Sequence, residues 1–411
     1  MAVGVSSYRQ THGMMNINSN PTGCLKLKSK RESSDTIKRL YHADNLLVLK
    51  ALLSEPSISG NVRLIYIDPP YNTGSDFECR NQDFAYSDKF TTEEYLSFMK
   101  ERLLLMHKLL SQDGSIYIHL DSKMVFHVKI LMDEIFGESN FKGLITRKKC
   151  KSKNYTKKTF GNISDYILFY SKSENPVWHR PYDAWSKEKV DKEYPFVEPE
   201  TGRKYKKVPI HAPGVRRGAT GGSWRGMLPP PGKHWQYTPD KLDEMDAKNE
   251  IYWSSTGNPR RKVYLDESNG IPVQDIWLDY LDINNQNTHQ TGYPTEKNLD
   301  MLKRIIEASS DAGDIILDCF VGSGTTLVAA EELGRQWIGV DIGDVAIATI
   351  KERLANGSKR LSELTKPQAT QPSLFDNDAF LPNENNEKKS IKEIRYDFYE
   401  YDSDQSDLTD R

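Results

Sequence analysis

The chain is poor in cysteine, in long apolar runs and in net charge. Its four cysteines, Cys24, Cys79, Cys150 and Cys319, are scattered without a CxxC pair, so the sequence indicates neither a disulfide framework nor a structural zinc site and favours a reducing cytoplasm. No apolar run reaches membrane-spanning length and no signal-peptide pattern is present, so we expect no membrane partner. A formal net charge of −2 excludes a uniformly basic coat for nucleic acid. A phosphate-binding Walker loop is also missing, so any ATP-driven step requires a separate chain.

Five regions differ in pattern along the 411 residues. Residues 1–37 are rich in Ser, Asn and Lys and predict a flexible arm. In residues 38–146 apolar strand and helix patterns alternate, whereas residues 147–290 are rich in loops, basic patches, Trp and Tyr. The alternation returns in residues 291–357, and residues 358–411 are polar and acidic, which predicts a mobile tail. Alternating strands and helices predict an α/β fold with a parallel sheet covered by helices.

Capping signals and apolar spacing set the expected elements of the two alternating regions. Asp44 is placed as a helix N-cap, and residues 91–94 resemble a capping box. We expect helices over residues 46–53, 95–110, 122–136, 295–309, 327–333 and 345–354, and strands over residues 61–68, 115–120, 314–318 and 337–341.

Asp68-Pro69-Pro70-Tyr71 follows the apolar run of residues 64–67. It offers a carboxylate, a stiff backbone carbonyl and an aromatic face at one strand end, because two prolines fix φ. These groups suit an exocyclic amine on a flat ring such as adenine N6, since two acceptors for its N–H bonds free its lone pair for attack. An ordinary strand-to-loop turn suits the same residues equally well.

A second motif lies in the cofactor-like unit of strand, glycine turn, helix and strand near the C-terminal end. Gly322 and Gly324 allow a ligand close to the backbone, and Asp341 at the next strand end is placed to accept from ribose hydroxyls. Leu327 stands where a dinucleotide fingerprint has its third glycine. Asp318 suits the ammonium group of S-adenosylmethionine, although many nucleotide-binding folds share such a turn.

The middle region carries charge of one sign. Between Thr201 and His234 there are eight Lys and Arg residues and no Asp or Glu, which predicts contacts with phosphates. The aromatic residues there suit base stacking or core packing, and packing is favoured. The candidate DNA contacts are Arg147, Lys148, Lys149, Lys151, Arg216, Arg217 and Arg225.

Together the two motifs resemble those of a β-class DNA amino-methyltransferase. Over residues 38–354 the chain is similar to the modification subunits of type III restriction systems and to site-specific adenine methyltransferases. The resemblance implies a Rossmann-like methyltransferase fold that uses S-adenosylmethionine, with circularly permuted motif order: catalytic half (38–146), inserted target-recognition region (147–290), cofactor half (291–357).

The resemblance also implies residue roles. Asp68 accepts from the target amine, Pro69 and Pro70 shape the acceptor turn, and Tyr71 stacks on a base flipped out of the DNA helix. Tyr293 departs from the family's usual His in the segment of residues 292–297. The residues that match cofactor-binding positions are Asp44, Lys297, Asp318, Phe320, Gly322, Gly324, Thr325 and Asp341.

Adenine N6 is the expected target because Asp68 stands where cytosine-N4 enzymes more often have Ser. A cytosine-N4 methyltransferase and a DNA-binding specificity subunit without catalysis remain the alternatives. A nuclease motif at residues 239–248 is disfavoured by its tight spacing, and direct methyl transfer needs no metal. Double-stranded DNA is the expected partner, and a homodimer and a separate restriction subunit are both possible further partners.

Residues 371–375 resemble a peptide that binds the sliding clamp, although Pro372 departs from the usual Leu. A plain linker is the favoured interpretation of this segment.

Overall fold

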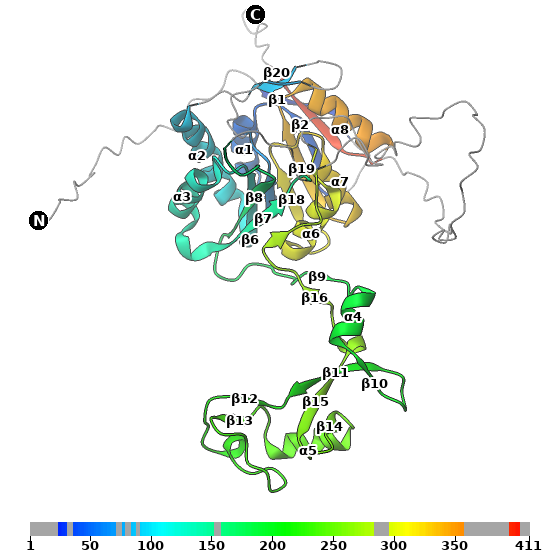
Figure 1. The fold of residues 1–411 in the computed structure, drawn as a ribbon. Helices are drawn as coiled ribbons and strands as arrows, with labels where there is room; N and C mark the ends of the chain where they lie inside the picture. Colours follow the sequence, from blue (N-terminus) through cyan, green and yellow to red (C-terminus); the bar gives the residue numbers. More distant parts are fainter. Residues whose placement is uncertain are drawn as a thin grey trace, which may run out of the picture. The chain divides into compact units, whose positions relative to one another are not determined.

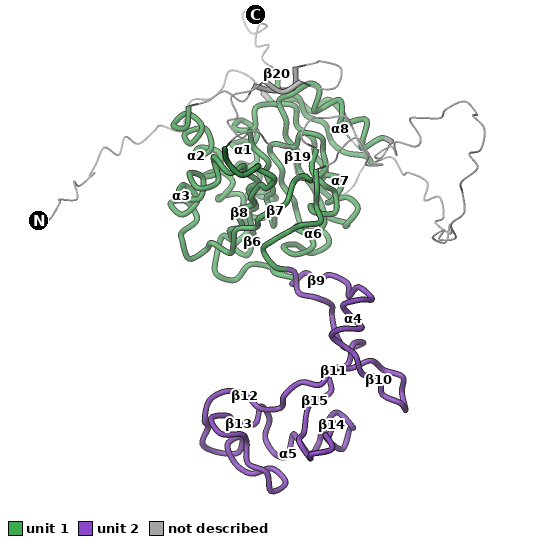
Figure 2. Tube along the Cα trace, in the orientation of Figure 1, with its two compact units in different colours: residues 1–179, 274–411 green, residues 180–273 purple. Residues whose placement is uncertain are grey.

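The computed structural model describes residues 24–30, 36–70, 76–78, 84–87, 91–151, 158–282, 296–356 and 394–402. These residues form two compact units, and the second is inserted into the first (Figure 2). Unit 1 comprises residues 1–179 and 274–411, and unit 2 comprises residues 180–273. Among the described residues, no helix combines the length and the apolar character that crossing a membrane requires.

Unit 1 is built on a ten-stranded mixed sheet with the order β1-β20-β2-β19-β18-β3-β6-β8-β7-β17. Strands β20, β2, β19, β18, β3 and β6 run parallel, and β8 is antiparallel to both β6 and β7. The strands are β1 Cys24–Ser29, β2 Lys38–His42, β3 Val62–Ile67, β6 Leu110–Leu120, β7 Phe141–Lys148, β8 Ser164–Ser171, β17 Ile276–Trp277, β18 Ile315–Asp318, β19 Gln336–Asp341 and β20 Asp397–Asp402, and a separate pair is β4 Asp76–Glu78 with β5 Phe84–Ser87.

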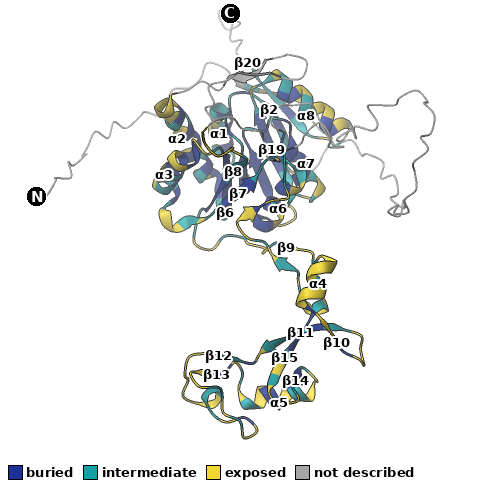
Figure 3. Ribbon diagram, in the orientation of Figure 1, coloured by how far each residue is buried: buried dark blue, intermediate teal, exposed yellow. Residues whose placement is uncertain are grey.

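Helices cover both faces of the sheet, so unit 1 has three layers (Figure 1). Helices α1, α2 and α3 pack their buried residues onto one face, in a core that includes Leu49, Met99 and Ile65. On the other face α6 contacts α7 and β3. The helices are α1 Asn45–Leu53, α2 Thr92–Leu109, α3 Val125–Phe136, α6 Leu299–Ser309, α7 Thr325–Glu332 and α8 Asp344–Asn356. Figure 3 shows the buried sheet between helices whose outer sides are exposed.

The expected capping signals are confirmed. Asp44 is the N-cap of α1, where its side chain accepts from the Leu46 N–H. Thr91 and Glu94 form a reciprocal capping box at the start of α2. Both devices satisfy backbone donors that a helix start leaves free. The expected helices and parallel strands lie within a few residues of their predicted bounds.

Two stretches that we expected to be unstructured are strands instead. β1 lies within the predicted N-terminal arm and β20 within the predicted acidic tail. They pair with each other antiparallel, and β20 also pairs parallel with β2, where Tyr41 stacks on Tyr399 at 4.6 Å between ring centroids. Strand β20 thus extends the sheet beyond β2, and the stacked pair Tyr41–Tyr399 stabilises this cross-strand pairing.

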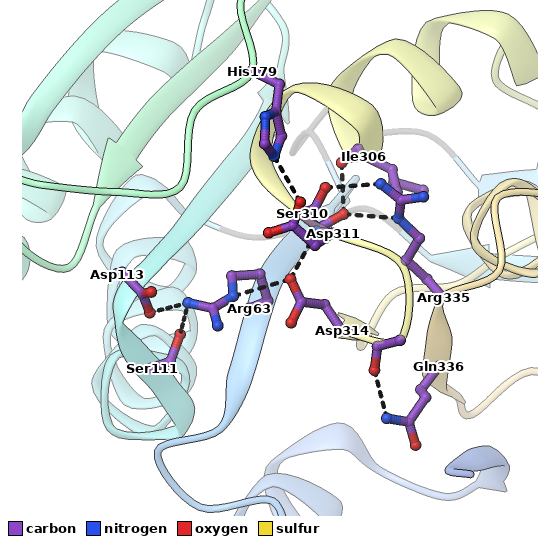
Figure 4. Close-up of polar contacts among 11 residues, drawn as sticks. Arg63, Ser111, Asp113, His179, Ile306, Ser310, Asp311, Asp314, Arg335 and Gln336 are labelled. Carbon is purple, nitrogen blue, oxygen red and sulfur yellow. Dashed lines mark hydrogen bonds and ion pairs between the residues drawn. The ribbon is translucent and has the colours of Figure 1, made fainter.

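Polar contacts tie the strands together at the edge where β3 and β18 begin (Figure 4). Arg63 on β3 pairs with Asp113, within β6, and with Asp314, just before β18. Arg335, just before β19, donates to the backbone oxygen of Ser310 at 2.7 Å. Ion pairs of Arg63 and a hydrogen bond of Arg335 therefore stabilise the edge at which these strands start.

Unit 2 has its own small core. Its main sheet is antiparallel with the order β10-β11-β15-β14, and two further pairs are β12 with β13 and β9 with β16. We predicted the insert at residues 147–290; the compact unit is shorter because β7, β8 and β17 belong to the sheet of unit 1. Its elements are β9 Tyr182–Asp183, α4 Lys187–Glu193, β10 Phe196–Val197, β11 Lys204–Pro209, β12 His211–Pro213, β13 Lys233–Trp235, α5 Pro239–Ala247, β14 Ile251–Trp253, β15 Pro259–Tyr264 and β16 Ile271–Pro272.

Candidate active site

Four acidic residues gather at the carboxyl edge of the parallel strands. Asp44 follows β2, Asp341 ends β19, Asp318 ends β18, and Asp68 follows β3. From β18 the chain continues outward to β19, whereas from β3 it continues outward to β6 on the other side. The strand order therefore reverses between β18 and β3, and ligands of open α/β sheets bind outside the carboxyl ends at such a reversal. Asp68 and Asp318 flank that position.

The Asp68 carboxylate is held by a lysine from the segment that precedes α6. Lys297 Nζ lies 2.8 Å from Asp68 Oδ2, and the two side chains are only 9% and 18% exposed. Pro69 is buried and Pro70 half-buried directly after it, so the carboxylate stands at the start of a stiff segment. Tyr71 and Tyr293 lie outside the described residues, so the stacking role of Tyr71 stays a prediction.

Asp318 is a buried carboxyl, 2% exposed, with neutral partners. It accepts from the Thr326 hydroxyl at 2.6 Å and from the Phe320 N–H at 3.0 Å. Burial raises its pKa to about 7, and the charges of Asp68 and Asp341 act in the same direction. No cationic side chain among the described residues pairs with it. A buried carboxyl of this kind is a suitable partner for a ligand's ammonium group.

The glycine turn between β18 and α7 has a backbone conformation that favours glycine at two positions. Gly322 and Gly324 have φ values of 52° and 80°, a left-handed region that glycine enters without strain. A Cβ at Gly324 would also lie 3.0 Å from Ile350 Cγ1. The Gly322 N–H donates to Asp341 Oδ2 at 2.8 Å, and the Gly343 N–H donates to Asp341 Oδ1 at 2.9 Å. Asp341 therefore ties the turn to the end of β19.

Helix α7 packs closely on strand β19 because the strand, and not the helix, supplies the glycine at the contact. Leu327 of α7 occupies the position where a dinucleotide motif has its third glycine. The matching glycine is Gly339 on β19, where a Cβ would lie 2.7 Å from Leu327 Cδ1. The turn thus keeps tight packing against the sheet with a leucine in the helix.

A buried polar cluster lies beside Asp44 and was not predicted from the sequence. Asn45 donates to the Cys319 carbonyl at 2.7 Å, and Arg102 Nε donates to Asn45 Oδ1 at 2.6 Å. The Arg102 guanidinium also stacks over the Phe98 ring at 3.6 Å, and this ring lies 6.0 Å from that of Phe320. These contacts join α1 and α2 to the turn that follows β18.

Glu296 and Arg353 form a second link that sequence reasoning missed. Arg353 of α8 pairs with Glu296 at 3.0 Å, and both side chains are buried. The same guanidinium donates to the Ser323 carbonyl and to Thr325 Oγ1. It therefore holds the glycine turn against the segment that carries Lys297. No local pattern marks this pair, because its members come from distant parts of the chain.

Arg147 is not available to DNA, so the prediction that it contacts DNA is wrong. Its side chain is fully buried. The guanidinium donates to both Asp165 oxygens, at 2.8 and 2.6 Å, and to Asp282 Oδ1 at 2.6 Å. A guanidinium whose donors are used inside the sheet has none left for a phosphate. Lys148 and Lys149 are half-buried and Lys151 is exposed, so these three stay candidates.

In unit 2 the basic residues separate into paired and exposed ones. Arg225 pairs with Asp243 and Asp246 of α5, and Arg203 pairs with Asp266 and Glu267. Arg216 and Arg217 are exposed in the segment between β12 and β13. They therefore remain better candidates for phosphate contacts than Arg225, which already has acidic partners.

The tryptophans of unit 2 pack rather than lie open. Trp224 and Trp235 are buried in the core of this unit with Leu242, Met245 and Ile251, and Trp253 packs against them. The packing role that we favoured for these aromatic residues is confirmed.

Comparisons with known proteins identify relatives of this chain. A family model described as DNA methylase (N6_N4_Mtase) matches residues 62–352. The chain is 51% identical over 315 residues to the type II methyltransferase M.EcaI of Enterobacter cloacae, covering 77% of this chain and 69% of that protein. It is 30% identical over 371 residues to the StyLTI Mod subunit, from a type III restriction-modification enzyme of Salmonella typhimurium, covering 80% of this chain and 54% of that protein. The chain thus spans about half the length of that relative. Among solved structures it is similar to an M1.HpyAVI–SAM complex, with 16% identity, a TM-score of 0.41, and coverage of 77% of this chain and 100% of that chain.

Proposed function

Because the chain belongs to the DNA methylase family, we propose that it transfers a methyl group from S-adenosylmethionine to N6 of adenine in double-stranded DNA. The observation that carries this proposal is the placement of Asp68 and Asp318 at the ends of neighbouring parallel strands. One strand end offers a proton acceptor, and the other offers a carboxyl for the cofactor beside a glycine turn. A methyl donor and an amine acceptor bound there would lie next to each other.

The cofactor fits the residues present. Asp318 offers a buried carboxyl with neutral partners to the cofactor's ammonium group, and Asp341 offers a carboxylate to its ribose hydroxyls. Phe320, Asp44 and Lys297 line the same strand edge and complete the proposed set with Thr325. The cofactor supplies a methyl group on a sulfonium, which makes that carbon open to displacement.

Asp68 then accepts a hydrogen bond from the target amine. The nitrogen lone pair forms the new N–C bond while the S–C bond breaks, and the amine proton leaves to Asp68 or to water. Asp68 works by position and charge, and its ion pair with Lys297 orients the carboxylate before the base arrives. Pro70 and Tyr71 would hold the flipped base, whose extraction from the duplex costs a few kcal/mol.

Unit 2 is proposed to supply DNA recognition. Its exposed Arg216 and Arg217, with Lys151 of unit 1, would neutralise phosphates, which fixes the position of the protein on the duplex. A separate restriction subunit is a further proposed partner, since one of the relatives is a Mod subunit. The sliding-clamp peptide of residues 371–375 lies outside the described residues and stays a prediction.

Asp68→Ala tests the proposed chemistry. We expect methyl transfer to fall to background while the Kd for S-adenosylmethionine changes by less than about threefold, because Asp68 acts on the amine. The measurements are transfer of radiolabelled methyl groups to unmethylated genomic DNA and calorimetric titration with the cofactor. Asp300→Ala, which changes an exposed aspartate on α6, is the matched control and should keep full activity. Retained turnover in Asp68→Ala would remove Asp68 from the mechanism.

A second experiment identifies the modified base. Expression in a host without DNA methylation, followed by sequencing that reads modified bases directly, reports the base, the amine and the site together. N6-methyladenine at a fixed site is expected. Detection of N4-methylcytosine would replace adenine by cytosine as the substrate and leave the rest of the proposal unchanged.

A further inference from the structure

The loop between β12 and β13 of unit 2 presents a short exposed tip (Figure 1). The tip is Val215-Arg216-Arg217, whose three residues are all exposed, Val215 to 79%. Among the described residues neither arginine of the tip forms an ion pair, and the sequence from Thr201 to His234 contains no Asp or Glu. The tip therefore combines positive charge with one apolar side chain.

The start of the tip is tied to the hairpin that carries it. Gly214 has a φ of 97°, in the left-handed region, and turns the chain away from β12. Its N–H donates to the Gly232 carbonyl at 2.9 Å, and its own carbonyl accepts from His234 Nδ1 at 2.7 Å. His234 lies on β13 and is only 6% exposed. The tip thus begins at a point that is bonded to the body of unit 2.

The end of the tip is closed by a tight return of the chain. Gly218 has a φ of 109°, and its carbonyl accepts from the Gly221 N–H at 3.0 Å. Gly221 lies so close to the backbone of Arg216 that a Cβ at this position would overlap the Arg216 carbonyl oxygen. Three residues later the chain enters the core of unit 2 at the buried Trp224. The backbone of the tip is therefore fixed, although its side chains lie in solvent.

An exposed tip on a fixed backbone is suited to binding a partner. Loops that a rigid body holds in place commonly carry binding residues, and a preordered loop loses little further conformational entropy when it binds. A DNA duplex fits the chemistry of the tip. Its phosphates attract the two arginines, and the apolar group among the base edges of its major groove is the 5-methyl group of thymine.

We propose that the tip reads the DNA site: Arg216 and Arg217 hold it on phosphates, and Val215 contacts the 5-methyl group of a thymine in the major groove. This role rests on the proposed DNA methylation. Phosphate contacts place a protein on the duplex, whereas contacts with base edges specify the sequence. Val215 is thus a residue that determines which sequence is methylated.

Removing one methyl group from the DNA tests the contact. The substrates are short duplexes with the site found by sequencing of the methylated genome, each with a different single thymine replaced by uracil, which lacks only the 5-methyl group. At one position, uracil should lower kcat/KM of the wild type about three- to tenfold, as expected for the loss of roughly one buried methyl group. Val215→Ala should lower kcat/KM on the thymine duplex by a similar factor and should not respond to uracil at that position.

Two other variants show what loss of a different contact looks like. Val197→Ala is the matched control, because Val197 on β10 is also an exposed valine of unit 2, at 54%. It should keep both the wild-type kcat/KM and the response to uracil. Arg216→Ala/Arg217→Ala should lower kcat/KM on all the duplexes by the same factor and keep the response to uracil, because phosphates carry no sequence. A site without thymine, or a Val215→Ala that responds to uracil at every position as the wild type does, would overturn the proposal.

Gly221→Ala tests the fixed backbone. Its Cβ forces the chain at Arg216 to move, so kcat/KM at the site should fall about ten- to a hundredfold, as expected for a displaced binding group. The Kd for S-adenosylmethionine should stay within about twofold. The control is Gly222→Ala, whose φ is −84° and whose Cβ would lie 3.6 Å from the Ala219 carbonyl oxygen, an ordinary contact. Equal losses in the two variants would refute the need for a fixed backbone.

The outcomes separate this proposal from the one on which it rests. A wild type that transfers no methyl group to any DNA would refute the proposed function. A wild type that methylates a fixed site, with the same kcat/KM in Val215→Ala, would refute only the reading role. Because Val215 is an exposed side chain, this comparison does not depend on whether Gly221→Ala folds.

Discussion

Replacing Asp318 with asparagine is expected to stabilise the ligand-free protein in alkaline solution and to weaken its binding of S-adenosylmethionine there. The reason is the burial of this carboxyl at the end of β18, which raises its pKa from 3.8 to about 7. A carboxyl with a raised pKa binds its proton more tightly in the folded state than in the unfolded state. Its folding penalty is therefore absent below about pH 4 and grows as the pH rises toward 7.

The size of the effect follows from the pKa. Each unit of pKa difference is worth about 1.4 kcal/mol, so ionisation of Asp318 costs the folded state about 4 kcal/mol at pH 8. Between pH 5 and pH 8 the wild type should lose about 3 kcal/mol of its free energy of unfolding from this group alone. Asp318→Asn cannot ionise and should not show that loss.

The replacement keeps both hydrogen-bonded contacts of the wild type, with the direction of one of them reversed. The Phe320 N–H donates to Oδ1, which remains an oxygen in asparagine. The amide nitrogen then takes the place of Oδ2, where the Thr326 hydroxyl can turn and accept from it. The comparison therefore isolates the charge.

The assay is urea unfolding of wild type and variant at pH 5 and pH 8. The advantage of Asp318→Asn should grow by about 3 kcal/mol between the two pH values, and Asp300→Asn, which changes an exposed residue, should show no such trend. If the variant is more stable than the wild type by the same amount at both pH values, burial does not disfavour the charged form of Asp318, and the reasoning would fail.

Cofactor binding should respond in the opposite direction. If the Asp318 carboxylate pairs with the cofactor's ammonium group, binding requires loss of its proton, so the Kd of the wild type should fall about tenfold per pH unit between 5.5 and 7 and level off above. Titration calorimetry over this range should find a flat and weaker profile in Asp318→Asn. The same slope in both proteins would place the ammonium group elsewhere.

Three further changes test other parts of the structure. Lys297→Met removes the largely buried ion pair with Asp68 and should cost about 3 kcal/mol in urea unfolding, whereas Lys303→Met, from a more exposed pair with Glu332, should cost under about 1 kcal/mol. Gly339→Ala crowds Leu327 and should lower the free energy of unfolding by about 1–3 kcal/mol. The double variant Gly339→Ala/Leu327→Ala should lose less than the sum of the losses in the two single variants. Losses that simply add would contradict the close approach of these two residues. Arg216→Ala/Arg217→Ala should lower the slope of log K for DNA against log salt by about 2, while Arg203→Ala, whose guanidinium already pairs with Asp266, should leave the slope unchanged.

The sequence predicted the elements whose signals are local. Asp44 as N-cap, the capping box at Thr91 and the apolar runs that end at Asp68 and Asp318 each depend on a few consecutive residues. Parallel strands bring their ends to one edge, so the meeting of Asp68 and Asp318 follows from two local motifs and one rule of topology.

The features that the sequence did not reveal depend on distant partners. Strand β20 is rich in acidic residues, so the sequence predicts that it belongs to a mobile tail. It forms a strand because it pairs with β1 and β2. Arg147 stands among lysines, so the sequence predicts a basic patch there. In the fold it is buried because it pairs with Asp165 on the neighbouring strand. Arg353 and Glu296 likewise meet only after folding. Such pairs carry no periodicity that a single sequence displays.

The two ends of unit 2 lie side by side. Tyr182 pairs with Pro272 and Asp183 with Ile271, and the Val273 N–H donates to the Pro181 carbonyl at 3.0 Å. An insert whose ends already meet adds little loop-closure entropy to its host, and this cost grows only slowly with the length of the insert. Evolution could therefore exchange one such cassette for another of different size while the catalytic body is inherited unchanged. Splicing a foreign insert at the same two positions would test the proposal that unit 2 sets the DNA specificity.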